Sequence, residues 1–209
     1  VIGLTGCTSK EVVLENAYDV CDTSAKYGIT ENGASQSAEF FARDLVVTED
    51  ENLGLEKTTE RVAEAAGVFL TSKKEAVYKK NIFEKLYPAS TTKILTAYVA
   101  LKNGNLDDVV TVSANAANQA SDSSVCELKE GDKITLRDLL YGLMLRSGND
   151  AAVAIAEHIS GSSEEFVVLM NAEAKALGAT GSHFVTPNGL HDEEHYSTVY
   201  DLSLIHISE

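Results

Sequence analysis

The sequence is poor in the residues that build disulfide frameworks and metal centres. It contains three cysteines, two prolines, two methionines and no tryptophan. Three cysteines make neither a disulfide framework nor a zinc-binding spacing, and the metalloprotease pattern H-E-x-x-H is absent. The five histidines lie late in the chain at spacings that fit no metal signature, so we expect structural or surface roles for them. The sequence therefore predicts no metal site and no cofactor.

Basic residues are also scarce, and long apolar runs are absent. The chain has 32 acidic residues against 17 basic ones, which gives a formal net charge of -15. This charge, with no basic patch or stripe, argues against nucleic-acid binding. No apolar run approaches the length that spans a bilayer. A composition of 44% apolar and 23% charged residues is typical of a globular protein, and the length suffices for one domain with a full core.

The first residues of the chain resemble a processing signal. Residues 4–7 read Leu-Thr-Gly-Cys, which resembles a bacterial lipobox, the end of a lipoprotein signal peptide. The resemblance implies that residues 1–7 are a signal remnant and that Cys7 carries a lipid. The lipid would anchor the protein as a lipoprotein to the outer face of the cytoplasmic membrane, in an extracytoplasmic location. A short buried strand with a core cysteine is the alternative.

Residues 8–60 are polar, acidic and short of periodic apolar pattern. This composition predicts a mostly disordered tether, although residues 38–47 could form one short helix or strand. We expect no function for Cys21 in such a segment. The sequence leaves open whether Cys21 forms a disulfide with Cys126.

A serine and a lysine lie three residues apart at the start of a predicted helix. Residues 62–70 and 76–79 are predicted to pair as a hairpin, and a helix is predicted to begin no earlier than Pro88 and to end at Gly104. Positions i and i+3 share one helical face, so the Lys93 amine can reach the Ser90 hydroxyl. A serine nucleophile needs such a neighbouring base, and a helix N-terminus supports a developing negative charge. The alternative is an N-cap serine followed by an exposed lysine.

Two further helices are predicted around a second polar motif. Thr135 and Asp138 match the capping-box form, and Leu136, Leu139, Leu140 and Leu143 follow as a core-facing stripe. This helix should end before the loop Ser147-Gly148-Asn149, and Asp150 should cap the next helix, residues 151–159. A simple helix–helix turn that uses the backbone freedom of Gly148 is the alternative interpretation of the loop. Residues 162–177 and a segment capped by Ser197-Thr198 are predicted to form the last two helices.

The two motifs together resemble those of the serine penicillin-recognising enzymes. Residues 87–93 read Tyr-Pro-Ala-Ser-Thr-Thr-Lys, residues 138–152 surround Ser-Gly-Asn, and residues 183–192 contain Thr-Pro-Asn-Gly-Leu-His-Asp. With these flanking residues, the stretch 61–202 resembles the low-molecular-weight D-alanyl-D-alanine carboxypeptidases, or peptidase family S11. The resemblance implies an α/β fold of the β-lactamase/DD-peptidase-like transpeptidase type. Of that fold we expect the helical part and the N-terminal hairpin here.

The resemblance assigns a role to each motif residue. Ser90 would be the acylated nucleophile, Lys93 the general base, Ser147 a proton relay to the leaving amine, and Asn149 a contact for the substrate backbone. The substrate would be a peptidoglycan stem peptide ending in D-Ala-D-Ala, and β-lactams would acylate the same serine. Lys93 would need a lowered pKa, which burial near another cation would supply.

The end of the sequence departs from the family pattern. The family's third motif, Lys-Thr-Gly or similar on a later strand, is absent, and the chain stops within the last predicted helix. Residues 203–209 are interpreted as a non-native tail, and the later strands of the sheet and one oxyanion donor would be missing. Loss of one such donor costs roughly 10²–10³ in rate. We therefore expect this 209-residue chain itself to be inactive or poorly folded.

Two other functions compete with the carboxypeptidase hypothesis. One is a class A-like β-lactamase on the same scaffold. Against it, those enzymes commonly show Ser-Asp-Asn where this chain has Ser147-Gly148-Asn149, and no glutamate-bearing deacylation loop is evident. The other is a noncatalytic, wall-binding lipoprotein. The presence of Ser90, Lys93, Ser147 and Asn149 together argues against this interpretation.

Overall fold

The computed structural model describes residues 51–54, 63–70, 72–120 and 123–207. The predictions for Cys7, for Cys21 and for the tether up to residue 50 lie outside these residues. All of these described residues belong to one compact unit within residues 39–209.

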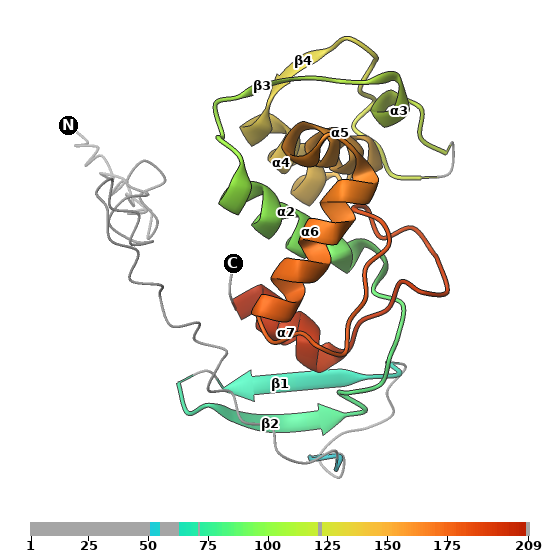
Figure 1. The fold of residues 1–209 in the computed structure, drawn as a ribbon. Coiled ribbons are helices and arrows are strands. Elements are labelled where there is room, and N and C mark those ends of the chain that lie inside the picture. Colours follow the sequence, from blue (N-terminus) through green and yellow to red (C-terminus); the bar gives the residue numbers. More distant parts are fainter. Residues whose placement is uncertain (1–50, 55–62, 71, 121–122, 208–209) are drawn as a thin grey trace, which may run out of the picture. The chain divides into compact units, whose positions relative to one another are not determined.

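An antiparallel hairpin precedes the helices (Figure 1). Strand β1 (Ala66–Leu70) pairs with β2 (Glu75–Lys80), and the register shifts between Val68 and Phe69. The predicted hairpin is thus confirmed, although β1 begins later than the apolar pattern suggested. Leu53 and Lys79 exchange two backbone hydrogen bonds of 3.0 and 3.1 Å. Part of the segment predicted as a tether therefore lies along β2.

The remaining elements follow in chain order. They are η3 (Ala89–Thr91), α2 (Thr92–Asn103), β3 (Val109–Thr111), α3 (Ala114–Ala117), β4 (Lys133–Thr135), α4 (Leu136–Leu145), α5 (Asn149–Ser160), α6 (Ser163–Ala176) and α7 (Val199–Ile207). Strands β3 and β4 form a second antiparallel pair. Helix α2 ends at Gly104, as predicted.

The hydrophobic core lies among helices α2, α4, α5 and α6, which pack on one another (Figure 1). Residues 151–156 of α5 are all buried, because their mostly small side chains allow the neighbouring helices to approach closely. The predicted leucine stripe of α4 is confirmed: Leu136, Leu139, Leu140 and Leu143 are all buried. Burial of one such side chain stabilises the fold by about 1.5–3 kcal/mol.

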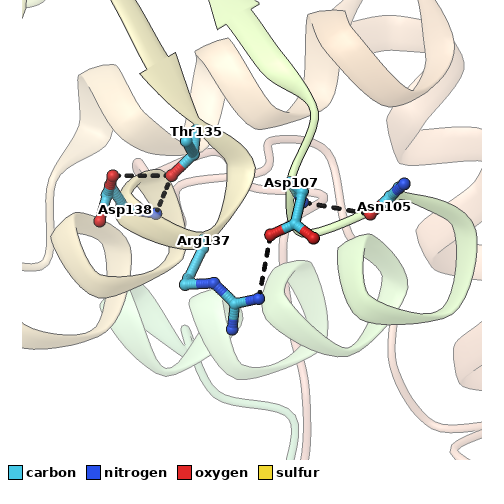
Figure 2. A network of polar contacts seen from close by, with 5 residues as sticks. All are labelled: Asn105, Asp107, Thr135, Arg137 and Asp138. Atoms are coloured by element: carbon cyan, nitrogen blue, oxygen red, sulfur yellow. Dashed lines mark hydrogen bonds and ion pairs between the residues drawn. The ribbon is translucent and has the colours of Figure 1, made fainter.

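The N-terminus of α4 carries the predicted cap with one difference (Figure 2). The Thr135 hydroxyl accepts a hydrogen bond from the Asp138 N–H at 3.1 Å, as a capping residue should. The Asp138 carboxylate accepts from the Thr135 hydroxyl at 2.7 Å, whereas a full capping box would place it on the backbone N–H of the cap. Beside it, Arg137 and Asp107 form an exposed ion pair at 3.2 Å.

The C-terminal segment folds back on the first half of the chain. The Thr198 hydroxyl accepts the Asp201 N–H at 3.0 Å and caps α7, as predicted. The connection between α6 and α7 has no helix of its own, but Ser197 pairs with Leu86 and so attaches it to the segment before η3. Helix α7 contacts α2 and β1 and includes residues 203–207. Among the described residues, no helix combines the length and the apolar character that crossing a membrane requires.

Candidate active site

Ser90 lies in η3, the single turn that leads directly into α2, and its side chain is exposed. The preceding residue, Ala89, has a φ of +47°, a backbone conformation that costs an alanine about 1–2 kcal/mol. Such strain persists only where the surroundings enforce it. Ser90 makes no side-chain cap, because the position before α2 is Thr91. The alternative of an N-cap serine therefore fails.

Lys93 is buried, with only 3% of its surface exposed, so the alternative of an exposed lysine fails too. Its Nζ donates to the Ser90 Oγ at 3.2 Å and to the Asn188 carbonyl oxygen at 2.7 Å. Burial lowers the pKa of Lys93 to about 8. No cation among the described residues contributes to this shift, so burial alone supplies the lowered pKa that a general base at this position requires.

The loop between α4 and α5 brings Asn149 to the same site. Ser147 adopts a φ of +56°, and Gly148 precedes Asn149, the first residue of α5. Asn149 is buried, and its backbone N–H donates to the Ser124 carbonyl at 2.8 Å. A Cβ on Gly148 would lie 2.5 Å from the Cys126 Sγ, so the close approach of this thiol requires glycine here.

Asp150 has a different role from the predicted helix cap. Gly148 occupies the cap position of α5, and Asp150 lies in its first turn. The Asp150 carboxylate accepts the backbone N–H groups of Cys126 at 2.9 Å and Leu128 at 3.0 Å. It thereby attaches the segment around residues 124–128 to the start of α5. Cys126 itself is a half-buried free thiol.

A cavity of about 360 Å³ opens beside Ser90. Residues from four segments line it: Tyr87, Pro88, Ala89, Ser90, Ser123, Ser124, Asn149, Asn188, Gly189, Leu190, His191 and His195. Ser90 and Asn149, predicted from separate motifs, therefore share one cavity, and Lys93 contacts Ser90 behind it. Ser147 does not line this cavity, and its hydroxyl makes no hydrogen bond to another described residue. Its predicted role as a proton relay stays a prediction.

Residues 188–191 and His195 form one wall of the cavity. The stretch 183–192 carried part of the family resemblance, but no role at the site was predicted for Asn188, Gly189 or His195. Asn188 supplies the carbonyl that holds Lys93, and Gly189 packs on the strained turn before Ser90. A Cβ on Gly189 would lie 1.9 Å from the Ala89 carbonyl oxygen. The Asn188-Gly189 pair was visible as a turn, but nothing local indicated that this turn meets α2. His195 was expected to have a structural or surface role, and it is buried at this site.

The site has the composition of a serine nucleophile with a lysine base. Among the described residues, no group of three or more His, Cys, Asp or Glu side chains is placed to hold a metal ion. An amine with a pKa near 8, in contact with a serine hydroxyl in an open cavity, can accept the hydroxyl proton during attack on a carbonyl carbon. The geometry therefore fits acyl transfer.

The chain matches the sequence profile of the Peptidase S11 family, described as D-alanyl-D-alanine carboxypeptidase, over residues 22–208. This match begins well before residue 61, where the resemblance was expected to start. The D-alanyl-D-alanine carboxypeptidase DacF of Bacillus subtilis is 41% identical over 156 residues, covering 71% of this chain and 40% of the relative. DacC of Escherichia coli is 46% identical over 134 residues, covering 60% of this chain and 34% of the relative.

Solved structures of such proteins share the fold. The D-alanyl-D-alanine carboxypeptidase DacD from Francisella tularensis superposes with a TM-score of 0.67 at 35% identity, over 78% of this chain and 39% of that one. A mutant of a Streptomyces DD-transpeptidase gives a TM-score of 0.68 at 34% identity, over 72% and 62% of the two chains. The predicted DD-peptidase fold is thereby confirmed. The chain spans 40% or less of the length of the two curated relatives named above.

Proposed function

Because the chain belongs to the D-alanyl-D-alanine carboxypeptidase family, we propose that it carries the nucleophile and base of a serine enzyme of this activity. The reaction is removal of the terminal D-alanine from a peptidoglycan stem peptide. The observation that carries the proposal is the contact of the buried Lys93 amine with the Ser90 hydroxyl at 3.2 Å. The relatives' names add the substrate class.

Acylation begins at this contact. The neutral Lys93 amine takes the Ser90 hydroxyl proton while Oγ attacks the carbonyl carbon of the penultimate D-alanine. The peptide C–N bond then breaks, and the proton held by Lys93 passes to the leaving amine, with Ser147 as the proposed relay. Water next attacks the ester carbonyl and gives one proton to Lys93. That proton returns to Ser90 Oγ as the shortened peptide leaves.

The remaining walls of the cavity position the substrate. Asn149 lines the same cavity as Ser90, and we expect its side-chain amide to hold the backbone of a bound peptide. The backbone N–H of Ser90 lies at a helix start, where it supports the negative charge that develops on the carbonyl oxygen. A β-lactam presents a similar carbonyl to the same serine, which supports the proposal that penicillins acylate Ser90.

We also propose that the protein acts outside the cytoplasm and is held at the membrane by a lipid on Cys7. The peptidoglycan substrate supports the first statement, and the lipobox-like residues 4–7 support the second. Metabolic labelling with palmitate in the native bacterium tests the anchor. Label should appear on the full-length gene product and disappear in Cys7→Ala. Equal labelling of the two proteins, or no labelling of either, would refute it.

A fluorescent penicillin tests the activity. The full-length gene product should form a long-lived adduct that is absent from Ser90→Ala, and it should release D-alanine from a pentapeptide substrate. Rapid hydrolysis of the penicillin would instead identify a β-lactamase. An adduct without release of D-alanine, or no adduct at all, would leave the carboxypeptidase proposal without support and favour the wall-binding role.

A further inference from the structure

The ring of His195 is buried between α2 and the segment 185–189, and its hydrogen bonds fix its tautomer. Nδ1 accepts the backbone N–H groups of Val185 at 3.1 Å and Thr186 at 3.3 Å. Backbone N–H groups only donate, so Nδ1 carries no proton. Nε2 must then carry it, and it donates to the Thr92 Oγ1 at 2.8 Å. His195 is therefore a neutral imidazole that joins this segment to the first residue of α2.

The same segment makes two further hydrogen bonds to α2. The Asn188 carbonyl accepts from the Lys93 Nζ at 2.7 Å, and the Pro187 carbonyl accepts from the Thr96 Oγ1 at 2.6 Å. The segment thus covers one face of α2 at positions 92, 93 and 96. Burial lowers the pKa of Lys93, and this segment contributes to that burial because the Asn188 carbonyl contacts the amine directly. The Asn188 carbonyl also accepts a hydrogen bond from one N–H of the amine, which leaves the lone pair of the neutral amine free to face Ser90.

The surroundings of His195 disfavour its charged form. Burial lowers the pKa of His195, Asp192 opposes the shift, and the His183 ring adds to it. The rings of Phe184 and His195 lie nearly perpendicular to each other with their centroids 5.5 Å apart, and α2 carries the Lys93 amine one residue after Thr92. A second proton on Nδ1 would break the bonds to Val185 and Thr186, since a protonated nitrogen cannot accept them.

We propose that His195 is a positioning residue that holds segment 185–189 on α2 and so keeps the Lys93 amine dry and directed at Ser90. The acylation consequence rests on the proposed function, whereas the effect on the Lys93 pKa does not. His195 touches neither the substrate carbonyl nor Ser90 in this role. It acts on the reaction only through the carbonyl of Asn188 and the burial of Lys93.

Burial lowers the pKa of Lys93, so a loss of burial should raise this pKa. If the segment lifts from α2, water reaches the amine and the Lys93 pKa rises toward its ordinary value. Less of the amine is then neutral near pH 7, so acylation slows and its acid limb moves to higher pH. A change that merely destabilised the fold would lower the melting temperature and leave the acid limb of the folded fraction where it was.

The test compares three variants in the full-length protein with lysine side chains labelled for NMR. His195→Phe removes all three hydrogen bonds of the ring and keeps its approximate size, whereas His195→Asn can keep an acceptor near the Nδ1 position. His158→Phe is the matched control, because that histidine pairs with Asp108 on the surface. The readouts are the pH titration of the Lys93 side chain, assigned with Lys93→Arg, and the rate of penicillin acylation against pH.

We expect His195→Phe to raise the Lys93 pKa by about one unit and to slow acylation at pH 7 about tenfold. In His195→Asn, the Lys93 pKa and the acylation rate at pH 7 should lie close to their wild-type values. In His158→Phe, both should equal the wild-type values. If His195→Phe does not fold, Thr92→Val removes the α2 partner of the same ring and should shift the titration in the same direction. An unmoved Lys93 titration in a folded His195→Phe or Thr92→Val variant, or equal shifts for Phe and Asn, would overturn the inference. Because the titration needs no turnover, failure of the wild type to bind penicillin would count against the proposed function alone.

Discussion

The two walls that meet at Ser90 are built in different ways. On one side, α2 carries Ser90 and Lys93 three residues apart, and the helix repeat alone brings their side chains together. On the other side, segment 185–189 has no regular structure and is positioned by bonds to residues some ninety or more positions earlier, such as Thr96 to Pro187. The helical wall carries the proposed nucleophile and base, and the irregular wall supplies their environment.

Substitutions on the two walls should therefore have different effects. A substitution on the helical wall can remove the chemistry and leave the fold intact or even more stable. A substitution on the irregular wall should disturb folding and chemistry together, because the contacts that place it also bury the base. The predictions below separate these two outcomes.

Lys93→Met should give the largest loss of activity and raise stability. Without the base, acylation by penicillin should fall by about 10³-fold. The fold should gain about 1–3 kcal/mol near neutral pH, since a buried cation is removed, although the Asn188 carbonyl loses its donor. Penicillin labelling and chemical denaturation measure the two effects.

The stability advantage of Lys93→Met over the wild type should decrease as the pH rises. The folded-state pKa of Lys93 lies at about 8, below the ordinary value of 10.5. The unfolded chain therefore binds more protons between these values, so the stability of the wild type rises with pH across this window. The advantage of Lys93→Met should be full below pH 8 and vanish near pH 10.5. A constant difference from pH 7 to 10.5 would contradict the assigned pKa.

Gly189→Ala should lower both the stability of the fold and the rate of acylation. The new Cβ would lie 1.9 Å from the Ala89 carbonyl oxygen, and the glycine has a φ of +82°. We expect a loss of about 3 kcal/mol in stability and of about 10²-fold in acylation, because the turn before Ser90 must move. Gly131→Ala is the matched control: its φ is +85°, but nothing lies within 4 Å of the added Cβ.

The Gly131→Ala control separates the cost of a positive φ for alanine from the cost of a steric clash, because only the first applies at this position. Gly131→Ala should cost about 1 kcal/mol and leave acylation unchanged. Thermal denaturation and penicillin labelling of both variants decide the question. Equal destabilisation by the two substitutions would mean that segment 185–189 does not press on the Ser90 turn.

The pH profile of the wild type should report the state of the helical wall. A base with a pKa of about 8 is roughly one per cent neutral at pH 6 and half neutral at pH 8. Acylation should therefore rise about fiftyfold between these values and level off above pH 9. Stopped-flow labelling with a penicillin whose own chemistry is constant over this range measures it. A flat profile would remove Lys93 from the role of general base.

The helical half of the fold was predictable because its signals are local. The Leu136–Leu143 stripe, the Thr135 cap and the i, i+3 pair of Ser90 and Lys93 each depend on residues within two turns of one another. Family resemblance then joined Ser90 to Asn149, which the periodicity of the sequence alone could not do.

The irregular wall was not predictable because its determinants are distant. His195 contacts Thr92, which lies 103 positions earlier in the chain. No pattern in the residues around either position predicts that the two side chains meet. Asp150 was misassigned for a related reason. An aspartate at a helix start usually caps it, but here the N–H groups of Cys126 and Leu128 lie within reach and bind the carboxylate instead. The positive φ of Ala89 had no sequence signal at all, since alanine does not favour it.

Thr135→Ala, outside the site, should give a smaller effect than the substitutions on either wall. It removes the acceptor for the Asp138 N–H at the start of α4, and Thr135→Ser keeps that acceptor as the control (Figure 2). We expect a loss of about 1 kcal/mol in stability for Ala and little for Ser, with the acylation rate of the folded protein and the Lys93 titration unchanged in both. Arg137→Ala, which breaks the neighbouring exposed ion pair, should cost less than about 0.5 kcal/mol. If Thr135→Ala moved the Lys93 titration, burial of the base would depend on the whole helical core and not on segment 185–189, and the distinction between the two walls would fail.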